Sequence, residues 1–327
     1  MTAARAVTAS PLPWDAVTTP NPLRGQERTW TETNCYVDLW LEVLHALGHD
    51  PRSSGAMALS ADFDGDQWTF LKQPAEDLSL LYGIEVAELN LWRPLEDHVV
   101  DHLAAGRLLT VEVDAYWLPD TAGLSYHEQH TKTTVVIHSV DRVAPAVGYF
   151  HGAGRFTAHG LDAEGLLRRH PSTAELPPYV EVVRLQRQHP DPEQVRRTAL
   201  GLVRHHLDRR PKDNPVARMG DAIVAAAPWL AEQPMQTFHA YAFATCRQCG
   251  GTAQLAADLC DWLGDLALEG VAARFRSVAA AAKSLQFSLA RAVRGRRVDL
   301  RALLDPMATD WAAGMSGVVE VVAARGD

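Results

Sequence analysis

The chain has 327 residues, more than one hydrophobic core usually supports, so two domains are expected. Its formal net charge of −9 argues against nucleic acid as a partner. Hydrophobic residues (47%) and charged residues (22%) are balanced as in soluble globular proteins. The N-terminus lacks the apolar stretch of a secretory signal, and no apolar run reaches the ~18 residues of a membrane span. The sequence therefore predicts a cytoplasmic protein.

The first strongly periodic stretch, residues 31–48, predicts an amphipathic helix. Its apolar residues recur at the i, i+3, i+4 spacing of one buried helical face. Thr33 or Asn34 can cap the first turn, which places Cys35 at the N-terminus of the helix. The helix dipole and the unpaired backbone N–H groups at such a position stabilise a thiolate. Cys35 is therefore either a candidate nucleophile or a small core residue.

The rest of the first half alternates helices with a run of strands. β-Branched and aromatic residues predict strands at 84–91, 108–119, 130–140, 147–160 (one or two strands) and 177–186, with a further short strand at 67–72. Helices are expected at 74–83, 93–106 and 161–170. One helix followed by consecutive strands favours an α+β fold, in which the nucleophile helix precedes an antiparallel sheet.

The second half is rich in Ala, Leu and Arg and contains no convincing strand. We expect helices at 192–209, 219–233, 235–250, 252–268, 271–293 and 306–324, packed as an antiparallel bundle. The segment HPDPEQ marks the change of character. The expected domains are therefore 1–188, which is α+β, and 189–327, which is all-α.

A cysteine nucleophile needs a general base within hydrogen-bond reach. His130 is the best-placed candidate, because it opens the strand 130–140 directly after a loop and so lies at the sheet rim. His127 lies in that loop, and His138 lies deeper in the strand. Most histidines lie on the surface or are buried with their hydrogen bonds made inside the core. The sequence therefore ranks these candidates without proving a role.

A third group should orient the imidazole of the base. Asp114 at the end of the preceding strand, Asp141 in the turn and His151 on the next strand are all candidates, and the sequence does not choose among them. The backbone N–H of Cys35 would supply one oxyanion donor, and Asn34 or Gln26 the other.

Four aromatic residues near these segments are core candidates, and one or two of them could line an acyl channel: Trp68, Trp92, Tyr116 and Trp117.

Several long runs resemble a bacterial family catalogued mainly as a domain of unknown function. The resemblance spans almost the whole chain and rests on NCYVDLWLEVLHALG, DFDGDQWTF, LYGIEVAELNLWRPLEDHV, VEVDAYWLPDTAG, HTKTTV, GYFHGAG, LPPYVE and HAYAFAT. More distantly, NC at a helix start, VDAYWLP and a histidine before a strand resemble the acyltransferase of butirosin biosynthesis. That enzyme moves an aminoacyl chain from a carrier protein onto an aminoglycoside amine.

The resemblance implies a papain-like fold with Cys35 as acyl acceptor and His130 as base. Papain-like peptidases usually carry Asn or Asp on the strand after the histidine, where this chain has GYFHG. His151 then substitutes for it, or the third member comes from elsewhere. Tyr116 and Trp117 are the substrate-binding candidates, no cofactor or metal is expected, and the donor would arrive on the phosphopantetheine arm of an acyl or peptidyl carrier protein.

The other three cysteines are weaker candidates for a reactive thiol than Cys35. The four cysteines give no disulfide framework and favour a reducing compartment. Cys246 and Cys249 form a CxxC motif at the end of a predicted helix, whereas a redox-active CxxC pair lies at the start of a helix. Cys260 is the one further cysteine nearby, so the three thiols do not make a complete set of zinc ligands. Burial in the bundle is the favoured interpretation. An arginine cluster is either a solvated face or a docking site for an acidic carrier protein: Arg291, Arg294, Arg296 and Arg297.

The leading hypothesis is an acyl- or aminoacyltransferase that passes its acyl group through Cys35 to a small-molecule acceptor. A thioester or amide hydrolase of the same fold is the closest alternative, with water as acceptor. A non-catalytic papain-like scaffold that binds a carrier protein is the third.

Overall fold

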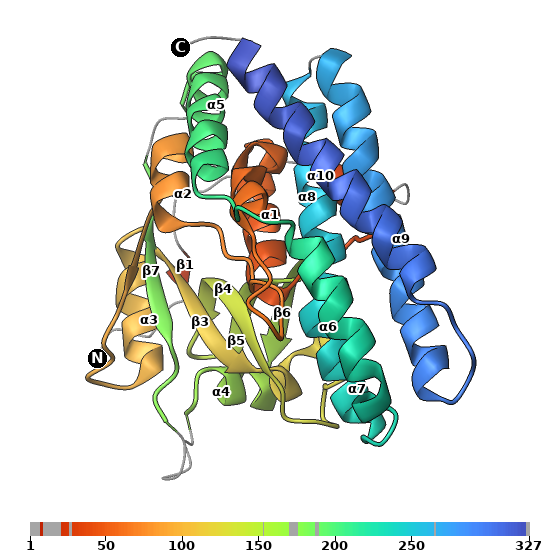
Figure 1. Ribbon diagram of the computed structural model, residues 1–327. Coiled ribbons are helices and arrows are strands. Elements are labelled where there is room, and N and C mark those ends of the chain that lie inside the picture. Colours follow the sequence, from red (N-terminus) through yellow and green to blue (C-terminus); the bar gives the residue numbers. More distant parts are fainter. Residues whose placement is uncertain are drawn as a thin grey trace. The chain divides into compact units, whose positions relative to one another are not determined.

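The computed structural model describes residues 7–8, 21–25, 28–152, 154–169, 176–186, 190–264 and 266–324 (Figure 1). The chain forms two compact units. The first holds the N-terminal residues up to Asn21, Cys35–Pro51 and Gln73–Pro190; the second holds Pro22–Asn34, Arg52–Lys72 and Asp191–Asp327. The second unit thus takes two segments that the sequence division assigned to the first domain.

The first unit is an α+β structure built on an antiparallel sheet. The strands follow the order β2-β7-β3-β4-β5-β6, and β1 pairs with the far end of β4 (Figure 1). Their bounds are β1 Val7–Thr8, β2 Glu85–Glu88, β3 Leu108–Asp114, β4 Lys132–Asp141, β5 Ala146–His151, β6 Gly154–His159 and β7 Val180–Arg184. The β-branched residues of the central strands β3 and β4 are buried, as their sequence pattern predicts.

Four helices complete this unit: α1 Cys35–Ala46, α2 Ala75–Tyr82, α3 Leu95–Ala104 and α4 Leu161–Leu166. α1 packs on β4 and β5 through a fully buried face centred on Trp40, so the predicted helix is confirmed. It is not amphipathic in its burial, because Tyr36 and Leu39 on its other faces are buried as well. α3 packs on β3 and β4, and α4 on β5 and β6.

Four predicted strands are shorter than expected, and a fifth is wrong; the shorter ones are 84–91, 108–119, 130–140 and 177–186. β3 ends at Asp114, because Ala115–Trp117 forms a 3₁₀ turn capped by that aspartate. β4 begins at Lys132, so His130 precedes the strand by two residues. The stretch 67–72 is not a strand: a single bridge joins Phe63 to Trp68.

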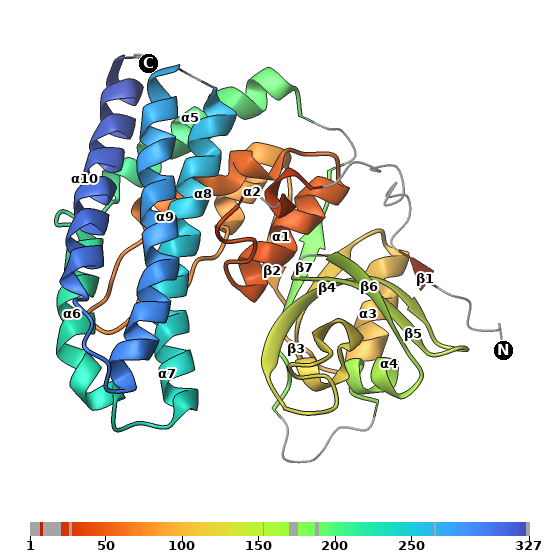
Figure 2. The ribbon, with the colours of Figure 1, turned by 90° about the vertical axis from the view of Figure 1, so that its right-hand side faces the viewer.

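The second unit is helical. Its helices are α5 Pro192–Asp208, α6 Pro215–Leu230, α7 Met235–Ala242, α8 Gln248–Leu263, α9 Leu266–Val293 and α10 Arg301–Ala324. Figure 2 shows α8, α9 and α10 side by side, in agreement with their extensive mutual packing. No helix among the described residues is long and apolar enough to cross a lipid bilayer.

The predicted helix break after CRQCGG is wrong. The chain runs from α7 through the π-helical turn Phe243–Arg247 directly into α8. The two glycines do not end a helix there but allow close packing, because a Cβ at Gly250 would overlap the indole of Trp30 and one at Gly251 would press on Thr33. Glycine at a close approach and glycine at a helix end look alike in a sequence.

The three thiols of the second unit are buried, as expected from the sequence. Burial raises the pKa of Cys246 and Cys260 from 9.0 to about 12. Both must stay protonated in the folded chain, so their contribution to stability is complete below pH 9.0 and is lost as the pH rises towards about 12.

We therefore expect the free energy of unfolding to fall by about 1.4 kcal/mol per pH unit for each of these thiols in that window. Urea unfolding at a series of alkaline pH values measures the slope. The double variant Cys246→Ala/Cys260→Ala should have a shallower slope than the parent, and equal slopes would contradict the assignment.

Candidate active site

Cys35 is the first residue of α1 and is half-buried. Its Sγ lies 3.8 Å from Oγ1 of Thr134 on β4. Asp38 stands in the same first helical turn. The thiol therefore meets the sheet at the end of the helix where backbone N–H groups point outward, which is the arrangement that suits a nucleophile and an oxyanion site.

His130 and Asp114 form a carboxylate–imidazole pair. Nδ1 of His130 lies 2.5 Å from Oδ2 of Asp114. The other oxygen, Oδ1, accepts the backbone N–H groups of Tyr116 and Thr131, each at 3.1 Å. The carboxylate is thus fixed by the backbone on one side and fixes the imidazole on the other. Since Nδ1 is engaged, Nε2 is the ring nitrogen left to exchange protons.

Aromatic packing holds the same imidazole from its face. The ring of His130 stacks on Tyr116 with centroids 4.6 Å apart and planes 17° apart. Tyr116 in turn contacts Trp117 edge-on and His127 at a tilt. Trp117 packs closely on Gly165 of α4, where any Cβ would overlap its indole. The side chain of His130 nevertheless remains 75% exposed, so an incoming substrate can reach it.

Cys35 and the His130–Asp114 pair belong to one face of the sheet. Thr134, which contacts the thiol, lies directly opposite Glu112 on β3, and side chains paired in this way share a face. Asp114 is two residues beyond Glu112 on the same strand, so it shares that face too. His130 lies four residues from Thr134, which limits their Cα separation to about 14 Å. No hydrogen bond joins Cys35 to His130 among the described residues.

His151 is not part of this arrangement. Its Nδ1 lies 2.6 Å from Oδ2 of Asp120, and its Nε2 lies 2.8 Å from Oγ1 of Thr133. Tyr149 donates its hydroxyl to the same carboxylate at 2.6 Å, and its pKa is raised mainly by burial. Thr133 and Thr134 are adjacent on β4 and point to opposite faces, so this second pair lies across the sheet from Cys35. Sequence reasoning missed Asp120, because a single loop carboxylate shows no periodic signal.

The remaining histidine and aspartate candidates have other partners. His127 lies 2.8 Å from Asp162 and is 49% exposed. His138 is buried edge-on against Phe150. Asp141 accepts backbone N–H groups of the β4–β5 turn. Of the three candidates for the orienting group, the structure brings only Asp114 to His130.

The proposed side-chain oxyanion donors are differently placed. The Asn34 amide donates to the carbonyl of Leu71 at 3.1 Å and to Oε1 of Gln248 at 3.2 Å, both within the second unit. Gln26 lies outside the described residues. The backbone N–H of Cys35 stays the leading candidate for the oxyanion donor.

The structure also locates the remaining aromatic residues and the arginine cluster that the sequence singled out. Trp68 is buried and donates to Thr252, whereas Trp92 is 79% exposed. The described residues contain no cluster of three metal-ligating side chains. The four arginines of the basic cluster, at the end of α9 and after it, are all exposed: Arg291, Arg294, Arg296 and Arg297.

Family models identify both halves of the chain. The DUF1839 N-terminal domain matches residues 19–185, and the DUF1839 C-terminal domain matches residues 192–320. The chain therefore belongs to the DUF1839 family, as the resemblance to a domain of unknown function predicts. No curated protein shows significant sequence similarity to the chain.

Proposed function

We propose that this member of the DUF1839 family is a cysteine-dependent acyltransferase whose first unit is papain-like. Cys35 would accept an acyl or aminoacyl group from a carrier-protein thioester, and His130 would transfer protons. Asp114 would orient the imidazole. The resemblance to the butirosin acyltransferase supports the reaction class, and the α+β sheet behind a nucleophile helix supports the fold.

The observation that carries the proposal is the fixed His130–Asp114 pair on the sheet face that Cys35 meets. A carboxylate held by two backbone N–H groups and engaged with imidazole Nδ1 is the usual support of a general base. The 75% exposure of the imidazole suits a site that must admit a large acylated partner. Tyr116 and Trp117 would form the wall beside the acyl chain.

The chemistry divides into two balanced steps. First, the Cys35 thiolate attacks the thioester carbonyl, a new S–C bond forms, and the donor C–S bond breaks. The protonated His130 gives its proton to the departing donor thiolate. Second, an acceptor amine or hydroxyl attacks the new thioester and loses a proton to His130, while the Cys35 thiolate leaves. The mechanism requires His130 to come within reach of the sulfur when donor binds, since catalytic contacts often tighten only in the complex.

The carrier protein would present its acyl group on a phosphopantetheine arm, and the acceptor would be a small molecule. An acidic carrier surface is complementary to an arginine-rich one. The exposed arginine cluster on and after α9 is the candidate docking surface for the carrier protein. The proposed reaction would not require a cofactor bound to the enzyme itself.

Turnover of acyl thioesters tests the proposal. The protein is incubated with an acylated carrier protein or a small acyl thioester, with and without added amines, and thiol release is followed alongside the products. Transfer predicts amide products that depend on the amine and vanish in Cys35→Ala. Free acid as the sole product would favour the hydrolase. Absence of thiol release would favour the non-catalytic scaffold. Thiol release that is unchanged in Cys35→Ala would contradict the role of Cys35 as acyl acceptor.

A further inference from the structure

Helix α8 begins with a glutamine whose side chain holds the two residues that lead into Cys35. Nε2 of Gln248 donates to the backbone carbonyl of Thr33 at 3.3 Å, and its Oε1 accepts the amide of Asn34 at 3.2 Å. At most 2% of each of these three residues is exposed. All three belong to the second unit, and Cys35 is the next residue of the chain.

Further contacts fix the same short segment. The Thr33 carbonyl also accepts Nε of Arg247 at 3.2 Å. The Asn34 amide also donates to the carbonyl of Leu71 at 3.1 Å. Gly251 packs so closely on Thr33 that a Cβ at the glycine would lie 2.9 Å from Cγ2 of the threonine. Residues 33 and 34 are therefore held through a carbonyl, a side-chain amide and a methyl group, which leaves little freedom to the peptide that follows.

The backbone that leads into Gln248 is irregular. The turn Phe243–Arg247 between α7 and α8 is π-helical. Adjacent side chains of a regular α-helix point about 100° apart, yet Arg247 and Gln248 both donate to the carbonyl of Thr33. Single π-helical turns occur frequently at functional sites. An irregular turn directly before two converging donors is a reason to look for a function of these donors beyond helix packing.

That function concerns the oxyanion site. A peptide bond is planar, so the direction of the Cys35 N–H is set by the atoms of Asn34 that share its plane. An oxyanion donor is effective only when it is aimed at the developing charge. We propose that Gln248 is a positioning residue for acyl transfer: by holding the two residues before Cys35, its amide aims the N–H of that cysteine at the oxygen of the thioester carbonyl. The inference rests on the proposed function.

Gln248→Met tests this role, because methionine has nearly the same size and makes neither hydrogen bond. Oxyanion contacts strengthen in the transition state, so kcat for thiol release from an acyl thioester should fall about ten- to hundredfold, with KM within about twofold of the parent. Alkylation of Cys35 by iodoacetamide forms no oxyanion. Its rate constant should therefore stay within about twofold of the parent, because the thiol itself is unchanged.

Gln254→Met is the matched control. Gln254 lies on the same helix, is 3% exposed and donates to Asp258 at 3.3 Å. The same substitution there removes a buried hydrogen bond without touching residues 33 and 34, so kcat should stay within about twofold of the parent. Melting temperatures check that the variants fold. Should Gln248→Met not fold, Arg247→Met removes the other donor to the Thr33 carbonyl from a partly exposed position, and kcat should fall about two- to fivefold with KM unchanged.

The outcomes separate the inference from the proposed function. A lowered kcat in Gln248→Met with an unchanged alkylation rate would support the inference. An unchanged kcat, or equal losses in Gln248→Met and Gln254→Met, would overturn it and leave the acyl transfer intact. A parallel loss of kcat and alkylation rate would also overturn it, because Gln248 would then only maintain the fold around the thiol. If the parent releases no thiol, or Cys35→Ala releases it equally fast, the proposed function itself fails and the inference falls with it.

Discussion

His130→Ala is expected to slow thioester turnover by about 10²- to 10⁴-fold, the range that general acid–base groups contribute. The loss has one physical cause, because the imidazole held by Asp114 is the proton carrier in both steps of the proposed mechanism. The substituted side chain is largely exposed, so the fold should be unaffected. Thiol release under saturating thioester measures the effect, and circular dichroism checks the fold.

His127→Ala is the matched control for that variant. His127 lies three residues away, also contacts Tyr116 and also pairs with an aspartate, Asp162. A specific role for His130 predicts that His127→Ala retains turnover within about threefold of the parent. Equal losses in both variants would mean that the aromatic stack, and not the proton carrier, had been disturbed.

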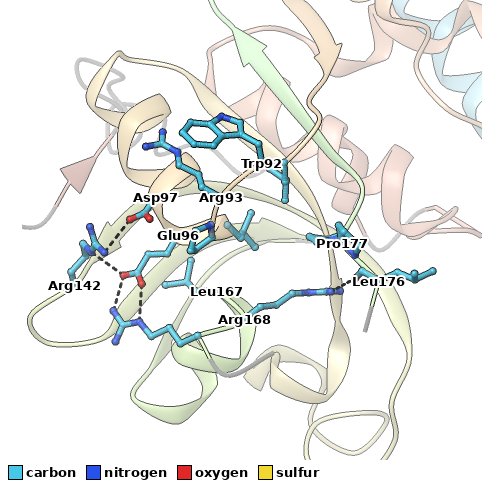
Figure 3. A pocket seen from close by; sticks show the side chains of 14 residues that line it. Trp92, Arg93, Glu96, Asp97, Arg142, Leu167, Arg168, Leu176 and Pro177 are labelled. Atoms are coloured by element: carbon cyan, nitrogen blue, oxygen red, sulfur yellow. Dashed lines mark hydrogen bonds and ion pairs between the residues drawn. The ribbon is translucent and has the colours of Figure 1, made fainter. Parts of the chain in front are cut away.

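Glu96→Ala should produce a large loss of stability, about 3 kcal/mol in the free energy of unfolding. The truncation removes the carboxylate that accepts two hydrogen bonds from the partly buried guanidinium of Arg169. Arg142 loses an ion pair as well (Figure 3). Burial increases this loss of stability, because water cannot fully hydrate the unpaired guanidinium at its place in the folded protein. Urea unfolding at neutral pH measures the difference from the parent.

Glu85→Ala provides the exposed counterpart. Glu85 pairs with Arg184 at 3.8 Å, with half or more of its side chain in solvent. A surface pair of this kind contributes about 1 kcal/mol at most, so this variant should be nearly as stable as the parent. Equal losses of stability in Glu85→Ala and Glu96→Ala would contradict the claim that the buried ion pairs of Glu96 stabilise the fold more than an exposed pair does.

The sequence predicts the elements of this fold well where one periodicity dominates. The helix that begins at Cys35 and the strands β3 and β4 have long, regular apolar patterns, and all three are present. The stretch 67–72 has the composition of a strand but lacks a neighbouring edge to pair with beyond one bridge. Local composition cannot supply a pairing partner.

The choice of orienting group could not be made from the sequence. Asp114 lies 16 residues from His130, and only the antiparallel register of β3 and β4 brings their ends together. His151 has equal merit in the sequence, yet strand alternation turns it to the other face, towards Asp120.

The central claim is that Cys35 carries the acyl group, and locating the acyl-enzyme tests it most directly. The protein is mixed with an acyl thioester, quenched in acid before the acceptor is added, digested and mapped by mass spectrometry. The account predicts one acyl group on the peptide that contains Cys35 in the parent, and no acylated peptide in Cys35→Ala. Acylation of a different residue, or an equal yield of acyl adduct in Cys35→Ala, would contradict it.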